Sequence, residues 1–176
     1  MISGQGATSI VVRNPVNVAS QAVVDSRMIA MTAKKKSVEV GELYLKNAIA
    51  RYNPEVAEIA RSGLKKMRKR FPGARVLVYD RRQSLPFGFA PAEGGAIFSI
   101  VLYPRWARFF FLEGVAIEDP EKRLEGAGSQ VRSIRLDEGA AVLDDPYIRG
   151  LMAQALKVAG ADLKRGSGEV VLKSVI

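Results

Sequence analysis

The sequence of 176 residues contains no cysteine and no histidine. Without cysteine the chain forms no disulfide and offers no thiolate to a metal ion. Without histidine it lacks the imidazole on which most zinc sites and both Ser-His-Asp and Cys-His catalysis depend. An enzyme built on this chain would have to work with carboxylate, lysine, tyrosine or serine side chains. These absences favour a non-catalytic protein without excluding an enzyme.

Long apolar runs are also missing. No stretch approaches the roughly 20 consecutive apolar residues that a membrane-spanning helix needs. Residues 1–30 contain no continuous apolar segment of the kind found in signal peptides. We therefore expect a cytoplasmic protein with no membrane partner, and the chain length predicts one domain plus tails.

Positive charge is in excess, with a net charge of +9 and a pI near 10.0. Residues 1–37 carry five Lys/Arg and one Asp, whereas residues 38–160 carry nineteen Lys/Arg and fifteen Asp/Glu. Such a pI is typical of proteins that bind nucleic acid or an acidic surface. No aromatic residues interleave the basic ones in residues 1–37, which weakens that interpretation.

The N-terminal residues differ from the rest of the chain. Met1–Ala30 has no helical or strand period, so we predict a flexible arm over residues 1–37. It could serve as an interaction arm. We favour a disordered extension, or a mis-assigned start with the natural one near Met31, because a small, polar, basic leader follows that methionine.

Two helices are predicted next. A first helix over residues 39–51 follows from the helical spacing of Leu45, Ala48, Ile49 and Tyr52. Asn53 is a good N-cap and Pro54 fits the first helical position, so a second helix begins there. It ends near Arg70, before Phe71-Pro72-Gly73.

Strands and a last helix follow. Two predicted strands, Ala96–Tyr103 and Ala107–Leu112, are apolar on both faces, which is typical of central strands. They are joined by Pro104-Arg105-Trp106, and this short link predicts an antiparallel hairpin. Gly88 indicates an edge strand or a bulge. Asp145 caps a last helix that ends at Gly160. The predicted strands are Arg75–Asp80, Leu85–Ala90, Ala96–Tyr103, Ala107–Leu112 and Val131–Leu136.

This order predicts an α+β fold, in which an antiparallel sheet of about five strands is flanked by two N-terminal helices and one C-terminal helix. The predicted domain covers residues 38–160. Residues 161–176 are predicted to be a loose C-terminal tail, with a short strand near Glu169–Leu172.

Several motifs together resemble the pattern of a known domain family, and two positions differ from that pattern. The motifs are Leu102-Tyr103-Pro104-Arg105-Trp106, Phe110-Phe111-Leu112, Asp119-Pro120, Leu124-Glu125-Gly126-Ala127-Gly128 and Arg132-x-Ile134-x-Leu136. Together they resemble the YdhG-like domain family, a widespread bacterial domain of unknown function, over roughly residues 40–160. Ser129 stands where many relatives have Lys, and Ser133 where many have His, so a function of either residue would be lost or altered here.

The resemblance implies a helix-flanked antiparallel sheet and, because part of the family is described as frataxin-like, an iron-chaperone role. Iron would need exposed carboxylates, since hard ions favour oxygen ligands when imidazole and thiolate are absent. The alternative is turn and cap chemistry, which we favour. No other cofactor is expected. The candidate metal ligands are Glu118, Asp119, Glu121 and Glu125.

The predicted hairpin holds the best candidate for a ligand site. Tyr103, Arg105 and Trp106 combine an aromatic face with guanidinium donors, which suits a small organic anion. Arg132 shares a strand face with Ile134 and is expected to point inward, toward an anionic partner. The competing interpretation is that Trp106 packs on a strand and Arg132 forms an internal ion pair.

A second candidate surface is the basic end of the second helix. Lys65, Lys66 and Lys69 could bind the phosphates of nucleic acid, or they could simply complement the negative end of the helix dipole, which we favour. The sequence therefore predicts a non-catalytic module that binds a small ligand, a metal or a protein partner. The alternative is a basic nucleic-acid-associated protein.

Overall fold

The structure is a computed structural model that describes residues 15–173, with side chains from residue 26 onward except that of Glu138. The chain divides into two units, residues 1–37 and residues 38–176, and the boundary coincides with the predicted start of the folded domain. What the sequence analysis predicts for residues 1–14 and 174–176 lies outside the described residues. No helix in the described part of the chain is long and apolar enough to cross a membrane.

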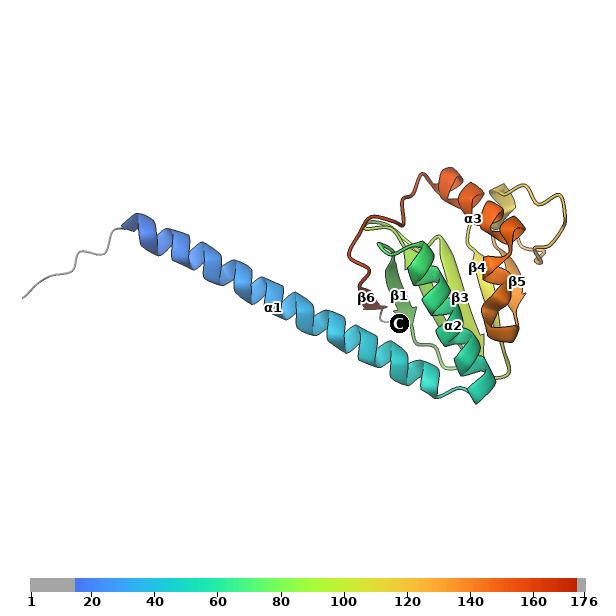
Figure 1. Ribbon diagram of the computed structural model, residues 1–176, viewed down its shortest axis with the longest axis horizontal. Helices are drawn as coiled ribbons and strands as arrows, with labels where there is room; N and C mark the ends of the chain where they lie inside the picture. The colour runs from blue at the N-terminus through green and yellow to red at the C-terminus, as the bar shows by residue number, and fades with distance from the viewer. Residues whose placement is uncertain (1–14, 174–176) are drawn as a thin grey trace, which may run out of the picture. The chain divides into compact units, whose positions relative to one another are not determined.

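Helix α1 runs over Pro15–Ala50, a length of 36 residues (Figure 1). The helix predicted at residues 39–51 is only its C-terminal part, so the expectation of an arm without regular structure is wrong from Pro15 onward. The reason lies in the local sequence: no glycine or proline occurs between Val16 and Val40. Once its packed end has formed, a helix extends at little cost through such a stretch.

The other helices follow the predicted capping residues. Helix α2 spans Pro54–Arg70, and the Asn53 side chain accepts a hydrogen bond of 2.8 Å from the backbone N–H of Val56. Helix α3 spans Pro146–Ala159, and the Asp145 carboxylate accepts one from the backbone N–H of Tyr147. Two short 3-10 helices complete the helical set, η1 at Gly114–Ala116 and η2 at Glu138–Asp144.

Six strands form one sheet in the order β5-β4-β3-β2-β1-β6 (Figure 1). All neighbouring pairs are antiparallel except β1 and β6, which run parallel. The predicted α+β class is confirmed, with one strand more than the five first expected. The strands are β1 Arg75–Tyr79, β2 Leu85–Ala90, β3 Phe98–Tyr103, β4 Trp106–Phe111, β5 Arg132–Leu136 and β6 Val170–Lys173.

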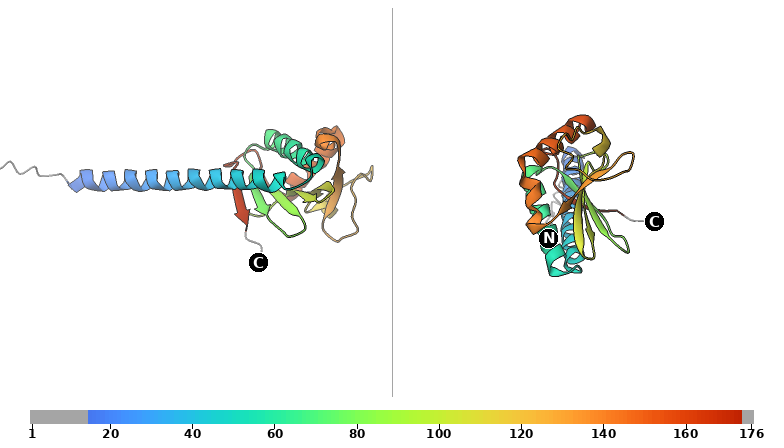
Figure 2. Two further views of the ribbon diagram at one scale, coloured as in Figure 1. Left: turned by 90° about the horizontal axis from the view of Figure 1, so that it is seen from below. Right: turned by 90° about the vertical axis from the view of Figure 1, so that its right-hand side faces the viewer.

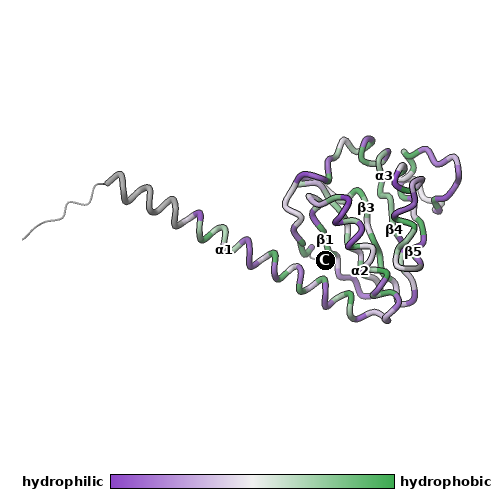
Figure 3. Tube along the Cα trace, in the orientation of Figure 1, coloured by the Kyte–Doolittle hydropathy of each residue, from purple (hydrophilic) through white to green (hydrophobic). Residues whose placement is uncertain are grey.

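One face of the sheet is covered by helices α2 and α3 (Figure 2, right). Alternate residues of each strand point into this layer, because side chains of a strand alternate between faces. The hydrophobic colour of Figure 3 accordingly runs through β3 and β4. The largest side chains that are fully buried include Phe87, Phe89, Phe98, Phe109 and Phe111.

Two features of the sheet correct the sequence analysis. Strand β2 lies inside the sheet, between β1 and β3, so Gly88 marks neither an edge nor a bulge. A Cβ at Gly88 would lie 2.6 Å from the Cβ of Ala96, which shows that the segment after β2 passes close over this residue. The C-terminal residues are not loose either, because Leu163 is buried and Val170–Lys173 form β6.

The antiparallel order also fixes where the turns lie. The β1–β2 turn, residues 80–84, and the β3–β4 turn, Pro104-Arg105, are at the same end of the sheet. The turn between α1 and α2 reaches this end as well, since Asn53 Nδ2 donates a 3.0 Å hydrogen bond to the Pro104 carbonyl. Segments far apart in the sequence are therefore neighbours here.

Candidate functional site

Helix α2 separates its apolar and charged residues cleanly. Its inward positions pack on the sheet, and Gly63 lets the helix approach closely, since a Cβ there would lie 2.9 Å from Ile100 Cδ1. The outward positions are basic along the second half of the helix, and the last turn holds Arg68, Lys69 and Arg70. This amphipathic pattern places cations on both flanks of α2. The buried residues are Val56, Ala57, Ala60, Gly63 and Met67.

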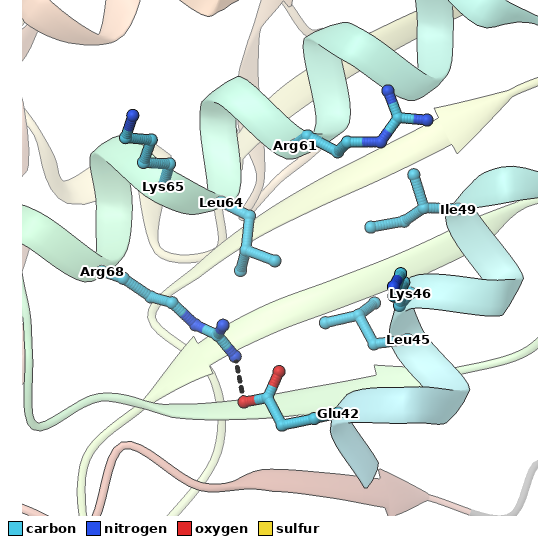
Figure 4. A pocket seen from close by; sticks show the side chains of 8 residues that line it. All are labelled: Glu42, Leu45, Lys46, Ile49, Arg61, Leu64, Lys65 and Arg68. Carbon is cyan, nitrogen blue, oxygen red and sulfur yellow. Dashed lines mark hydrogen bonds and ion pairs between the residues drawn. The ribbon is translucent and has the colours of Figure 1, made fainter. Parts of the chain in front are cut away.

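A groove of about 470 Å³ lies between the C-terminal part of α1 and helix α2 (Figure 4). Leu45 and Ile49 from α1 and Leu64 from α2 form its apolar floor. Four cations and one carboxylate surround this floor, and an apolar floor with a few polar groups around it is typical of small-molecule sites. The charged residues are Lys46, Arg61, Lys65, Arg68 and Glu42.

Two of the four cations around the groove are already paired. Arg68 donates to Glu42 across the groove at 2.6 Å, as the dashed line in Figure 4 marks. Arg61 pairs with Glu58 on its own helix at 3.0 Å. Lys46 and Lys65 have no ion pair within the described residues, so their charges are available to an anion.

A second hollow, of about 580 Å³, lies on the opposite flank of α2, where the helix faces η2 and α3. Its one carboxylate, Asp144, is bound by Lys66 and, at 3.1 Å, by Arg70. These two cations outweigh partial burial and lower the pKa of Asp144. Five cations line the hollow: Lys65, Lys66, Lys69, Arg70 and Arg149.

The three lysines that the sequence analysis named as a nucleic-acid surface thus lie together in this hollow. Lys66 forms an ion pair with Asp144, whereas Lys65 and Lys69 have no ion pair in the part of the chain that the structure describes. The hollow therefore carries more positive charge than its own carboxylate neutralises. Local pairing explains Lys66 without a ligand, but it does not explain Lys69 or Arg149.

The predicted hairpin cluster is assembled in part. Tyr103 and Trp106 face each other across β3 and β4 with ring centroids 5.0 Å apart, and Arg105 is exposed in the turn between them. The Arg108 guanidinium, which sequence reasoning did not name, lies 5.9 Å from the Trp106 ring centroid. Trp106 keeps 38% of its surface exposed, so it is not a core residue.

Arg132 does not join that cluster. It pairs with Phe111, at the far end of β4 from Trp106. Its guanidinium donates to the carbonyls of Gly128, at 2.6 Å, and Val131, at 2.9 Å. Backbone carbonyls thus take the place of the anionic partner that the inward orientation predicted. The four-residue ligand site is reduced to the three residues of the hairpin.

The four candidate metal ligands take part in local structure. Asp119 accepts hydrogen bonds from the Tyr147 hydroxyl at 2.6 Å and from the Leu124 backbone N–H at 2.8 Å. Partial burial would raise the pKa of Asp119, but these hydrogen bonds outweigh it and lower the pKa. Glu125 pairs with Arg108, and Glu121 with Arg123 at 3.9 Å, while the Glu118 side chain forms no ion pair with any described residue. Among the described residues, no group of three or more carboxylates could hold a metal ion.

Sequence reasoning missed a polar cluster beside the turn end of the sheet. The Asp80 carboxylate accepts hydrogen bonds from the Tyr44 hydroxyl and, at 2.6 Å, from Arg51. Arg51 and then Tyr44 lower the pKa of Asp80, and the Asp80 hydrogen bond raises that of Tyr44. The residues come from α1 and from the end of β1, so no spacing in the sequence could reveal them.

Two serines at which the chain differs from the pattern it resembles, Ser129 and Ser133, lie near each other in the chain but differ in exposure. Ser133 is buried on β5, and its backbone exchanges two hydrogen bonds of 2.8 Å with Glu125. Ser129 is exposed in the preceding loop. Neither residue lies in the groove or in the basic hollow.

Comparison of the chain with protein-family models, curated proteins and solved structures gave no match.

Proposed function

We propose that this protein is a non-catalytic binding module whose ligand is an organic anion with an apolar body, held in the groove between α1 and α2. The observation that carries the proposal is the combination of an apolar floor with unpaired positive charge around it. Leu45, Ile49 and Leu64 supply the floor, and Lys46 and Lys65 supply the charge.

The ligand class follows from that combination. An apolar ring or chain gains free energy by leaving water over the floor, at about 25 cal/mol per Å² of apolar surface buried. A carboxylate, sulfonate or phosphate group on the same molecule then reaches Lys46 or Lys65. A purely apolar ligand would leave these charges unused, and a small inorganic anion would leave the floor unused.

Membership of the YdhG-like family belongs to the same proposal. Its support is the run of motifs between residues 102 and 136, together with a helix-flanked antiparallel sheet of the kind that the resemblance implies. The candidate metal ligands do not support an iron-chaperone role for this chain. Asp119 accepts a backbone hydrogen bond within a turn, and Glu121 and Glu125 form ion pairs, which leaves only Glu118.

The groove can be tested with anilinonaphthalene sulfonate, which joins apolar rings to one anionic group and fluoresces when it leaves water. We expect saturable binding to the full chain. Lys46→Ala should weaken it about two- to fivefold, the effect of one exposed ion pair. Leu64→Gln should weaken it further, since it makes the floor polar.

Lys69→Ala is the matched control, because Lys69 lines the opposite hollow and not the groove. Equal weakening by Lys69→Ala and Lys46→Ala would mean that the dye senses only overall charge, and the groove proposal would fail. Melting temperatures of the two lysine variants should match that of the wild type, and Leu64→Gln, whose side chain packs against the core, is compared at a temperature well below its own melting temperature. This excludes dye binding to partly unfolded protein.

A second candidate function, nucleic-acid association, is supported by the five cations that surround Asp144. If the hollow neutralises phosphates, binding of duplex DNA should weaken on Lys65→Ala, Lys66→Ala and Lys69→Ala together. The slope of log affinity against log salt should fall by about 0.9 for each phosphate contact that is lost. If binding disappears at moderate salt, the remaining interpretation is that these lysines complement the negative end of the helix dipole.

A further inference from the structure

A third hollow, of about 320 Å³, lies at the turn end of the sheet, away from both flanks of α2 that the proposals above use. It is formed where the α1–α2 turn, the β1–β2 turn and the β3–β4 turn meet. Tyr52 and Pro104 supply apolar surface, and Asn53 ties the turns together through its hydrogen bond to the Pro104 carbonyl. Three separate segments of the chain thus build one concave surface.

The hollow is rich in arginine. Arg51, Arg81 and Arg82 line it, and Arg105 follows Pro104 in the β3–β4 turn. The only carboxylate in its lining, Asp80, is already bound by Arg51 and Tyr44. Arg81, Arg82 and Arg105 form no ion pair with any described residue, so the hollow has a net positive charge.

Two aromatic side chains, those of Tyr103 and Trp106, flank the Pro104-Arg105 turn, whose Pro104 lines the hollow. Because strand side chains alternate and their neighbours Leu102 and Ala107 are buried, both point to the other face of the sheet. Their rings lie 5.0 Å apart, and Trp106 is 38% exposed. The Arg108 guanidinium lies 5.9 Å from the indole centroid but is paired with Glu125, so it adds no free charge to this surface.

We propose that this turn end binds single-stranded nucleic acid, with phosphates at Arg81, Arg82 and Arg105 and an unpaired base on Trp106. Guanidinium groups match phosphate oxygens with two parallel hydrogen bonds, which an ammonium group cannot do. An exposed aromatic next to a basic groove is the combination that single-strand-binding proteins use, since every base offers a face for stacking. The proposal is independent of the groove and of the basic hollow on α2.

A single strand fits better than a duplex. In a duplex the bases are already stacked and paired, so Trp106 would add nothing and only the arginines would contribute. An inorganic phosphate or a phosphorylated side chain would likewise leave the indole unused. The aromatic pair therefore decides the ligand class, while the arginines decide its charge.

The test uses the full chain and the fact that Trp106 is its only tryptophan. A labelled oligothymidylate of about twelve nucleotides, within the range that one such module covers, is titrated against the protein. Anisotropy of the label reports binding, and intrinsic fluorescence reports the indole directly. We expect saturable binding in which the Trp106 emission is quenched with the same midpoint.

Two variants separate charge from stacking. Arg81→Ala with Arg82→Ala should weaken binding at least about tenfold and lower the salt slope by about 1.4, since each single-strand phosphate contact contributes about 0.7. Trp106→Ala should weaken binding about 5- to 150-fold with an unchanged salt slope, because stacking is worth about 1–3 kcal/mol per base. Lys164→Ala with Arg165→Ala is the control: it removes the same charge from an adjacent exposed pair elsewhere.

Each of the following results would overturn the proposal: no binding of the oligonucleotide, binding without quenching of Trp106, equal weakening by the control pair, or a duplex or thymidine monophosphate that binds as tightly as the single strand. Weakening by Lys65→Ala with Lys69→Ala, but not by Arg81→Ala with Arg82→Ala, would move the ligand to α2 and would also overturn it. None of these outcomes bears on dye binding in the α1–α2 groove, so the two proposals fail separately.

Discussion

The two faces of the sheet use aromatic side chains in opposite ways. On the helix-covered face, Phe98, Phe109 and Phe111 have no exposed surface, and their ring centroids lie 5.2–5.6 Å apart. On the other face, Tyr103 and Trp106 remain partly exposed beside arginines. Similar residues therefore stabilise the fold on one face and are available for recognition on the other.

Strand β4 contains both roles in six residues. Ala107, Phe109 and Phe111 point to the helices, whereas Trp106, Arg108 and Phe110 point away. The difference is set by register alone, because a shift of one residue would exchange the two sets. Whether an aromatic residue of this strand is core or surface is thus a property of the pairing, not of the residue type.

The largest test of the comparison is Phe98→Ala. Phe98 is fully buried and packs against Phe71, Phe109 and Phe111. Its truncation should lower the free energy of unfolding by about 3–5 kcal/mol, measured by urea denaturation. Trp106→Ala should lose less than half as much, because solvent fills the space that the indole leaves. Equal losses would erase the distinction between the two faces.

A smaller effect is expected from Gly88→Ala, which probes how open the second face is. The new Cβ would meet Ala96 at 2.6 Å, so the segment after β2 must move away. We expect a loss of about 1–3 kcal/mol by thermal or urea unfolding, the range for overpacked sites. Gly95→Ala is the matched control, because a Cβ there meets nothing within 4 Å. If both substitutions are neutral, the segment does not lie against β2.

The order of elements could be predicted from the sequence because local signals determine it. Asn53 and Asp145 predicted two helix starts, and the apolar runs predicted the central hairpin. Helix α1 was predicted too short, since its first half carries no apolar period to reveal it. Strand β6 was only suggested, because its pairing with β1 is parallel and joins distant segments.

The candidate sites were harder to predict, for a physical reason. The groove joins residues of two helices whose contact is decided by tertiary packing, not by the spacing within either helix. The turn-end hollow joins Arg51, Arg81 and Pro104 from three turns. Only the contact between Tyr103 and Trp106 could be predicted from the sequence, because the local geometry of a hairpin makes these two residues neighbours. The grouping of Arg132 with Trp106 was wrong, because the register of β5 on β4 places Arg132 opposite Phe111.

The turn end itself can be weakened by Asn53→Ala. The side chain caps α2 through the Val56 N–H and also holds the Pro104 carbonyl. Loss of the cap should cost about 1 kcal/mol in unfolding experiments. Asn53→Asp keeps the cap but loses the donor to Pro104, so it should recover most of that stability. No recovery would mean that the bond to Pro104, rather than the cap, is the important contact.

The smallest expected effect is a pH dependence from Asp80, which borders the same turn end. Arg51 and then Tyr44 lower the pKa of Asp80 in the folded protein, so folding favours the ionised carboxylate. This stabilisation is present above the unfolded pKa of about 3.9 and is lost as the pH falls through the lower folded value. Solvent screening keeps it small, since a third of the side chain is exposed. The difference in unfolding free energy between wild type and Asp80→Asn should therefore be constant near neutral pH and shrink in acid. Tyr44→Phe should reduce the dependence without removing it, whereas a difference that grows in acid would mean that the pair does not favour the charged form.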